Sequence, residues 1–409
     1  MCDKDTIADA GQGISLYIHI PYCISKCAYC DFFSRPSLKP VSSYIPDDYI
    51  NALIKEISYR IKKNKIEKLR TVYIGGGTPS LLTERQLEIL FEEINKYKSA
   101  DAEVTVEVNP DDVNEAFLKA LSCCGVTRLS CGIQTMNDAA LKKACRRADA
   151  KTNLKALELF SKEWKGQLSI DLISGLPLDD EESLLNSLKT VCELNPCHVS
   201  LYSLTIEEET PFGKALEKGE LNYDFDRADK LWLCGRDYLE QKGYEWYEVS
   251  NFCRKGNECR HNLTYWTHKS YLGCGSGATG SLYYEGGQGL RWTDTRDIEK
   301  YIEYWKTFDL YEAREEEELF QTEELIDKET SQFEFFMMGL RKLSGFSEGD
   351  YRTIFGEELP KKFLSVFEKW EDKGLCLKHI SEDSRGQDCV YAMSRGGILF
   401  LNRFLGEIC

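Results

Sequence analysis

The first half of this 409-residue chain repeats one pattern, in which a short β-branched run is followed by a longer amphipathic stretch. Strands are expected at residues 14–20, 71–74, 103–108, 127–131, 168–173 and 198–204. Helices are expected at 47–63, 84–96, 113–123, 137–162 (one helix or two) and 181–193. Six strand–helix units with parallel crossovers predict an α/β protein, built as a partial barrel or as a doubly wound sheet.

The last quarter of the chain has a different pattern. Residues 312–329 are strongly acidic, which is typical of a solvated helix or a linker between domains. Helices are then expected at 333–343, 349–355 and 361–373, a hairpin at 375–379 and 389–393, and a last helix near 397–404. This order predicts a small winged-helix-like accessory domain. The predicted division is a tail at 1–13, a barrel with a closing extension at 14–310, a linker at 311–330 and the accessory domain at 331–409.

The composition argues against several classes of function. Acidic residues outnumber basic ones by 68 to 52, so an electrostatic grip on nucleic acid or on an anionic membrane is not expected. The first thirteen residues lack a signal-peptide pattern, and no run approaches the ~18 apolar residues of a membrane span. The 17 cysteines are scattered and odd in number, which indicates a reducing cytoplasm rather than a secreted disulfide framework.

Three of these cysteines, Cys23, Cys27 and Cys30, follow the first expected strand with the spacing Cys-x3-Cys-x2-Cys. Three thiolates on one short loop can hold three irons of a [4Fe–4S] cube and leave the fourth iron open to a small molecule. The alternative is zinc, which usually requires a fourth ligand. The nearest candidate, His19, lies within an apolar strand, where a packed histidine is the default.

Other polar residues follow the later strands or lie late within them. Gly75-Gly76-Gly77-Thr78-Pro79 ends the second strand, and its glycines let the backbone approach a ligand closely. Glu107 precedes the turn at Asn109-Pro110, although a strand carboxylate can also be simply exposed. Asp171 lies in an apolar strand, where burying it without a partner would be costly. Because functional residues of such folds gather at the carboxyl ends of the strands, one shared site is expected.

The cysteine spacing, with its Tyr29-Cys30-Asp31-Phe32 ending, resembles the signature of radical S-adenosylmethionine (SAM) enzymes. Together with the glycine run and Gly175-Leu176-Pro177, residues 14–177 resemble the oxygen-independent coproporphyrinogen III oxidase (HemN) family. The similarity continues through 200–204, 209–212, 247–252, 260–266 and 271–275 and fades in the C-terminal domain.

This resemblance implies a (β/α)6 partial TIM barrel with a [4Fe–4S] cluster on the three cysteines. SAM would chelate the open iron, and an electron from a reductant such as flavodoxin or ferredoxin would yield methionine and a 5′-deoxyadenosyl radical. Gln134 would bind the ribose and Arg146 would pair with the SAM carboxylate. The full set of SAM contacts that the resemblance implies is Tyr17, Tyr29, Gly76, Gly77, Thr78, Glu107, Gln134, Arg146 and Asp171.

Within the family, the chain resembles the HemW-like branch of heme chaperones, which bind heme and transfer it to client hemoproteins. Phe32 stands where the oxidases carry a further cysteine, and the chain has no long extension before its first strand. The branch also shares the segment His261-Asn262-Leu263-Thr264-Tyr265-Trp266.

His261 is accordingly a candidate heme ligand, with Tyr265 and Trp266 offering flat faces for a macrocycle. The alternatives are a structural histidine in the layer that closes the barrel, or heme ligation by Cys253 or Cys259. No catalytic residue is assigned beyond the cluster and the SAM site. Whether the chain is an enzyme therefore stays open between a heme chaperone, a coproporphyrinogen III oxidase and a radical heme-modifying enzyme.

Overall fold

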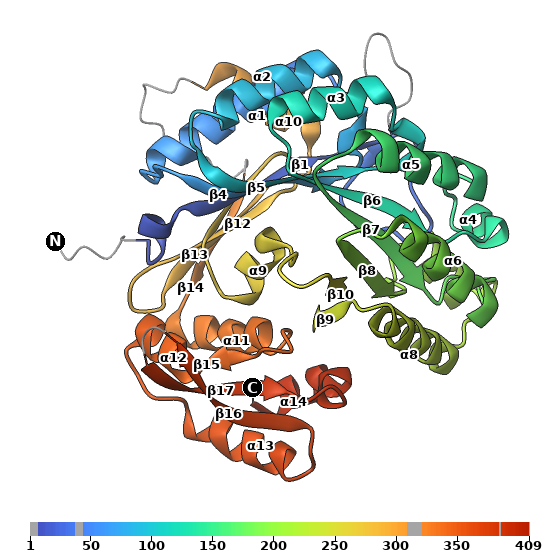
Figure 1. Cartoon of the computed structure of the whole chain (residues 1–409). Coiled ribbons are helices and arrows are strands. Elements are labelled where there is room, and N and C mark those ends of the chain that lie inside the picture. Colours follow the sequence, from blue (N-terminus) through green and yellow to red (C-terminus); the bar gives the residue numbers. More distant parts are fainter. Residues whose placement is uncertain (1–6, 37–43, 309–320, 384–385, 409) are drawn as a thin grey trace.

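A twelve-stranded sheet runs through the larger part of the molecule in the computed structural model (Figure 1), which describes residues 7–36, 44–308, 321–383 and 386–408. Its centre is six neighbouring parallel strands: β1 (Ile14–Ile20), β4 (Leu69–Gly76), β5 (Lys98–Val108), β6 (Arg128–Gln134), β7 (Gln167–Ser174) and β8 (His198–Ser203). The connecting helices are α1 (Asp47–Lys63), α2 (Glu84–Ile94), α3 (Glu115–Cys124), α4 (Asp138–Lys143), α5 (Ala150–Glu163) and α6 (Glu181–Leu194). The structure confirms the α/β fold and these strand–helix units.

Alternation along the strands explains why the sheet buries one face and keeps the other polar. In β1, Ile14, Leu16, Ile18 and Ile20 are completely buried, whereas Ser15, Tyr17 and His19 alternate with them. The apolar set packs beneath the outer helices, and the polar set points to the concave side. The same division repeats in β4 and β5, so the interior of the partial barrel is lined by polar side chains at successive levels.

The strands beyond the parallel core extend the sheet in both directions. One edge continues through β10 (Asn251–Cys253) and β9 (Glu245–Glu248). The other continues through β11 (Tyr271–Cys274), β12 (Thr279–Tyr283), β13 (Gly289–Asp294) and β14 (Gln321–Ile326). The remaining helices of this part are α7 (Pro211–Glu217), α8 (Phe225–Gln241), α9 (Arg260–Trp266) and α10 (Ile298–Thr307). Helix α9 lies on the concave side of the sheet (Figure 1).

The C-terminal part contains the helices and the hairpin expected from the sequence. They are α11 (Lys328–Gly339), α12 (Glu348–Phe355), α13 (Lys361–Glu371), the hairpin of β16 (Cys376–Asp383) and β17 (Gly386–Met393), and α14 (Leu401–Ile408). A short strand β15 (Phe346–Ser347) completes a three-stranded sheet in the order β15-β17-β16. Its core is aromatic, with Phe336 stacked on Phe363 at 4.4 Å between ring centroids. The winged-helix-like assignment of this part and the exact domain boundaries stay predictions.

One segment settles an alternative that the sequence left open, and another differs from the sequence-based expectation. The region 137–162 forms two helices, because Asn137 and Asp149 each cap a separate helix and Cys145 between them has a positive φ of 57°. Residues 321–326, expected within the acidic linker, form β14 and pair with β13. An edge strand bonds through its backbone, so the acidic side chains can face water while Gln321 and Ile326 are buried. Of the rest of the predicted linker, 311–320 lies outside the described residues, whereas 327–330 caps and begins α11.

None of the described helices combines the length and the apolar character that crossing a bilayer requires.

Candidate functional site

The three-cysteine loop begins directly after β1 and is fastened to two neighbouring helices. The Ala28 N–H donates to the Ala144 carbonyl at 3.0 Å, at the end of α4. The Ala28 carbonyl accepts from the N–H of Phe212 at 2.9 Å, at the start of α7. The short strands β2 (Tyr22–Cys23) and β3 (Arg35–Pro36) pair and close the loop at its base. The backbone therefore holds the loop in place at the carboxyl ends of the barrel strands.

Two side chains donate hydrogen bonds to the sulfurs of this loop. The Thr78 hydroxyl donates to Cys23 Sγ at 3.4 Å, and Arg146 Nη1 donates to Cys27 Sγ at 3.6 Å. Burial raises the pKa of Cys30 to about 11 in the metal-free protein, and binding to iron would remove that proton. The thiols of Cys23, Cys27 and Cys30 are partly exposed and form no disulfide.

This donor set fits an iron–sulfur cluster. Donors aimed at two sulfurs stabilise the negative charge that thiolate ligands bring. Among the described residues, no three His, Cys, Asp or Glu side chains are placed to hold a single metal ion. A cube does not need such convergence, because each cysteine binds a different iron.

The glycine run at the end of β4 lies against the cysteine loop. Gly76 has a φ of +108°, a conformation that disfavours any side chain, and its N–H donates to Glu107 Oε2 at 3.1 Å. A Cβ on Gly77 would lie 2.6 Å from the Tyr22 carbonyl oxygen and 2.8 Å from that of Ile20. Both residues therefore have to be glycine for the backbone to run this close to the loop.

Two carboxylates face the concave side near this run. Glu107 accepts from the Tyr73 hydroxyl at 2.8 Å, and Asp171 accepts from Ser130 at 2.7 Å and from Ser169 at 3.2 Å. Burial, and after it the charge of Asp171, raises the pKa of Glu107 to about 7. Burial likewise raises the pKa of Asp171, and hydrogen bonds from the serines oppose this shift. A cation bound here would favour both ionised carboxylates.

Arg146 and Gln134 converge on the end of β6. Arg146 Nη2 donates to the Gly132 carbonyl at 2.7 Å and to Asn109 Oδ1 at 3.1 Å, while its buried Nε has no partner among the described atoms. Gln134 has a positive φ of 68°, and its Nε2 would lie 2.6 Å from a Cβ on Gly132. Gln134 and Arg146, both predicted to contact SAM, therefore lie together at the end of β6, and Arg146 Nε keeps an unused N–H there.

The two tyrosines of the predicted SAM set come from β1 and from the cysteine loop itself. Tyr17 stacks on Tyr73 at 6.3 Å between ring centroids, and its hydroxyl hydrogen-bonds His19 Nδ1 at 2.9 Å. Tyr29 lies close to Arg146, and burial raises the pKa of its hydroxyl. His19 Nε2 bonds the Phe33 carbonyl at 2.9 Å, so both of its ring nitrogens are occupied, as expected of a packed histidine.

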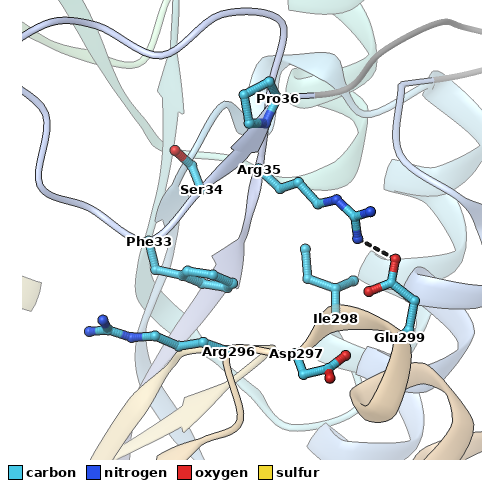
Figure 2. A pocket seen from close by; sticks show the side chains of 8 residues that line it. All are labelled: Phe33, Ser34, Arg35, Pro36, Arg296, Asp297, Ile298 and Glu299. Atoms are coloured by element: carbon cyan, nitrogen blue, oxygen red, sulfur yellow. Dashed lines mark hydrogen bonds and ion pairs between the residues drawn. The ribbon is translucent and has the colours of Figure 1, made fainter. Parts of the chain in front are cut away.

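The exit of the cysteine loop borders a surface pocket of 570 Å³ (Figure 2). Arg296 lies over the Phe33 ring at 5.9 Å, and Arg35 forms an ion pair with Glu299 at the start of α10. Phe33 in turn stacks on His19 at 6.1 Å. The pocket is thus separated from the concave interior by an aromatic layer.

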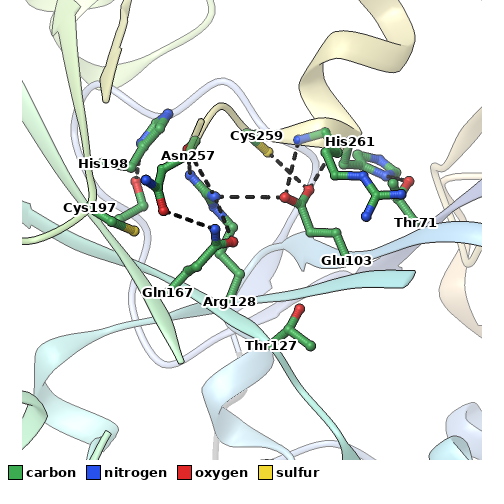
Figure 3. A network of polar contacts seen from close by, with 12 residues as sticks. Thr71, Glu103, Thr127, Arg128, Gln167, Cys197, His198, Asn257, Cys259 and His261 are labelled. Atoms are coloured by element: carbon green, nitrogen blue, oxygen red, sulfur yellow. Dashed lines mark hydrogen bonds and ion pairs between the residues drawn. The ribbon is translucent and has the colours of Figure 1, made fainter. Parts of the chain in front are cut away.

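The opposite end of the barrel is closed by α9 and a buried polar network (Figure 3). Glu103 accepts from the backbone N–H of His261 at 2.9 Å and from that of Arg260 at 3.1 Å, and thus caps the helix from outside. Arg128, 1% exposed, lies 3.7 Å from Glu103 and also donates to the Asn257 carbonyl at 3.3 Å. Sequence reasoning missed this network, although a charged residue within each of two apolar strands was a signal for it.

His261 belongs to this closed end of the barrel, which is called the floor of the barrel below, and does not lie at the cysteine end. Its Nδ1 is bonded to the Thr71 hydroxyl at 2.7 Å and its Nε2 to the Tyr265 hydroxyl at 2.8 Å. The ring is 1% exposed and stacks on Tyr73, and burial lowers its pKa to about 3. With both nitrogens occupied, the arrangement fits the structural alternative and offers iron no free ligand atom.

The two cysteines considered as alternative heme ligands are no more accessible. Cys253 is completely buried, and Cys259 is 3% exposed with its thiol donating to Glu103 at 3.6 Å. Trp266, which the sequence offers as a flat face for heme, is instead covered by the Arg341 guanidinium at 5.2 Å from the ring centroid. Neither thiol is therefore accessible to heme iron, and the Trp266 ring already has a partner in Arg341.

Comparison with known proteins places the chain in a family. Residues 17–191 match the model of the radical SAM superfamily. Heme chaperone HemW of Bacillus subtilis is 36% identical over 96% of this chain and 100% of its own length. Heme chaperone HemW of Haemophilus influenzae is 35% identical over 96% of this chain and 97% of its own length.

Among solved structures, the coproporphyrinogen III oxidase HemN of Escherichia coli superimposes with a TM-score of 0.76. The match covers 97% of this chain and 90% of HemN at 20% sequence identity, which shows a shared fold. With near-complete coverage of its relatives and a radical SAM match over the barrel, the chain belongs to the HemW family of the radical SAM superfamily.

Proposed function

We propose that the protein is a cytoplasmic heme chaperone that carries a [4Fe–4S] cluster and SAM and transfers heme to client hemoproteins. The observation that carries this proposal is the end-to-end similarity to proteins named heme chaperones, combined with an intact three-cysteine loop. The accessory domain at 331–409, which packs against the barrel through hydrogen bonds such as Val249 N–H to Arg341 O, is proposed to act with the barrel as one unit.

Each residue of the predicted site has a role that its contacts support. Cys23, Cys27 and Cys30 would hold the cluster, with Thr78 and Arg146 stabilising the charge on their sulfurs. When bound and reduced by a donor such as flavodoxin or ferredoxin, the cluster supplies the electron that SAM cleavage requires.

The remaining contacts would orient SAM. The backbone of Gly76 and Gly77 would receive its amino group, and the unpartnered Arg146 Nε would face its carboxylate. Glu107 and Asp171 would compensate the sulfonium charge and bind the ribose, with Gln134 at the same end of β6. Tyr17 and Tyr29 would bound the site on either side. The raised pKa of Glu107 supports this assignment, because a cationic ligand would restore the charge that burial disfavours.

A second candidate is the oxidative decarboxylation of coproporphyrinogen III. The fold shared with HemN over nearly the whole chain favours it. Phe32, which is 69% exposed, stands where that reaction's enzymes carry a further cysteine, and this argues against it.

The two functions are separated by one experiment. Anaerobically reconstituted protein is incubated with SAM and dithionite, with coproporphyrinogen III in one arm and heme in the other. Mass spectrometry reads the tetrapyrrole products, and size exclusion reads the heme that stays with the protein. Retained, unmodified heme without decarboxylation is expected. Replacement of two propionates by vinyl groups would make the protein an oxidase, and loss of the heme Soret band would make it a heme-modifying enzyme.

A further inference from the structure

A second pocket, of 340 Å³, is lined by residues that pack against the support of the cysteine loop. It is formed where the turn after β7 and the segment before α8 meet the end of α4. Its lining residues are Lys143, Gly175, Leu176, Pro177, Leu178, Leu221, Asn222, Tyr223, Asp224, Arg227, Ala228 and Leu231. The predicted SAM site does not use this pocket.

The charges of the pocket favour an anion. Lys143 and Arg227 are both exposed, and among the described residues neither forms an ion pair. Two carboxylates outside the lining, Asp180 and Asp229, lie within electrostatic range of Arg227 and Tyr223, respectively. The only carboxylate in the lining is that of Asp224, which caps α8 by accepting from the Arg227 backbone N–H at 3.0 Å. The lining itself therefore carries two cations and one capping carboxylate in a chain with a net charge of −16.

The rest of the lining is apolar and partly exposed. Leu176, Leu221 and Leu231 are buried in its floor, whereas the side chain of Leu178 is 64% exposed at the rim. Phe225, 56% exposed, contacts the ring of Tyr223 edge to face at 4.9 Å. An apolar rim next to two cations suits a ligand that has a flat apolar body and carboxylates at one edge.

The floor of the pocket is continuous with the support of the cysteine loop. Leu176 and Leu221 belong to one small core together with Ala28, and Tyr29 and Tyr223 pack against it. The Tyr223 hydroxyl is buried without a partner and would lie 2.8 Å from a Cβ on Gly175. A ligand in the pocket would therefore rest on the core that positions the cluster ligands.

The larger pocket of Figure 2 is the competing location, and its charges are balanced. Arg35 is already paired with Glu299, and Asp297 lies in the same lining as Arg296. It offers a dianion no net attraction.

We propose that the pocket at Lys143 and Arg227 is the docking site for heme, a deepening of the proposed function on which this inference rests. The two propionates lie on Lys143 and Arg227, and the macrocycle covers Leu178 and Phe225. A volume of 340 Å³ encloses only part of the ring, which leaves one edge free for transfer to a client.

The test is equilibrium binding of heme and of iron-free protoporphyrin IX to the full-length, cluster-loaded protein. The double charge reversal Lys143→Glu with Arg227→Glu is expected to weaken both ligands about tenfold, because two exposed ion pairs to the propionates are lost and repulsion replaces them. The control, Lys142→Glu with Lys230→Glu, makes the same charge change on the same two helices at exposed positions outside the lining. Leu178→Asp tests the apolar rim and is expected to weaken both ligands severalfold.

The outcomes separate the site from the function. If the unaltered protein binds no heme, the proposed function fails. If it binds heme but the pocket and control variants have equal affinities, the site assignment is overturned. Binding of heme but not of protoporphyrin IX would also overturn it, because an iron ligand elsewhere would then dominate. Iron content of all variants is measured to confirm that the cluster stays intact.

Discussion

At the carboxyl ends of the strands, Glu107 and Asp171 are held by hydroxyl and backbone donors, and neither forms an ion pair with a described basic side chain. At the amino ends, Glu103 lies beside Arg128 and caps α9, and His261 uses both ring nitrogens. The residue types are similar, but at the carboxyl end the guanidinium of Arg146 keeps an unpartnered Nε, whereas the charged and imidazole groups of Glu103, Arg128 and His261 all have partners. Unused capacity marks a place for a ligand, whereas complete pairing marks a place that holds the fold together.

Replacing a cluster ligand at the carboxyl end is expected to have the largest effect. Cys27→Ala should abolish the absorption near 400 nm after anaerobic reconstitution and lower bound iron in proportion, because a cube held by two thiolates is not retained. Cys123→Ala, at an exposed cysteine far from the loop in sequence, is the control and should keep full iron. Intact iron in Cys27→Ala would show that the ligand assignment is wrong.

Removing Glu103 from the floor of the barrel is expected to lower the stability of the fold and to leave the cluster intact. Glu103→Ala leaves Arg128 buried without a charge partner and uncaps α9, so the free energy of unfolding should fall by about 4 kcal/mol. The shift is measured as the midpoint of urea unfolding, with Glu158→Ala on the exposed face of α5 as the control. Iron per folded molecule should not change. A variant that unfolds normally but binds less iron would contradict the division between the two ends.

The substitution His261→Ala tests whether the floor of the barrel also binds heme. The Tyr265 hydroxyl loses its partner, the Thr71 hydroxyl keeps only its bond to Ser15, and a cavity remains, which should cost about 3 kcal/mol of stability. Heme affinity of the folded variant should equal that of the unaltered protein, as measured by titration of the Soret band. A loss of heme binding at unchanged stability would restore the ligand role.

The same contrast explains what could be predicted from the sequence. The strands, the helices and the cysteine end were predictable, because periodicity is local and because Cys23, Gly76 and Glu107 lie at strand ends that meet at one edge. The floor was not, because the bond between Glu103 and His261 joins residues 158 positions apart. Locally, a heme ligand and a packed histidine look alike. The sequence also could not show β14, since its acidic residues pair through the backbone.

The last prediction concerns the pH dependence of the free energy of unfolding, to which Glu107 at the carboxyl end contributes. Folding raises the pKa of Glu107 from 4.5 to about 7, because burial and then Asp171 disfavour the charged form. The folded state therefore binds this proton more tightly than the unfolded state, and the resulting stability is fully present below pH 4.5 and lost as the pH rises through 7. Glu107→Gln removes that loss. Its stability relative to that of the unaltered protein, measured by urea unfolding without SAM, should rise with pH by about 3 kcal/mol and level off above pH 7. The control Glu158→Gln should run parallel to the unaltered protein. If Glu107→Gln also runs parallel, then the carboxyl end holds no strained carboxylate, and the electrostatic argument for a cationic ligand there fails.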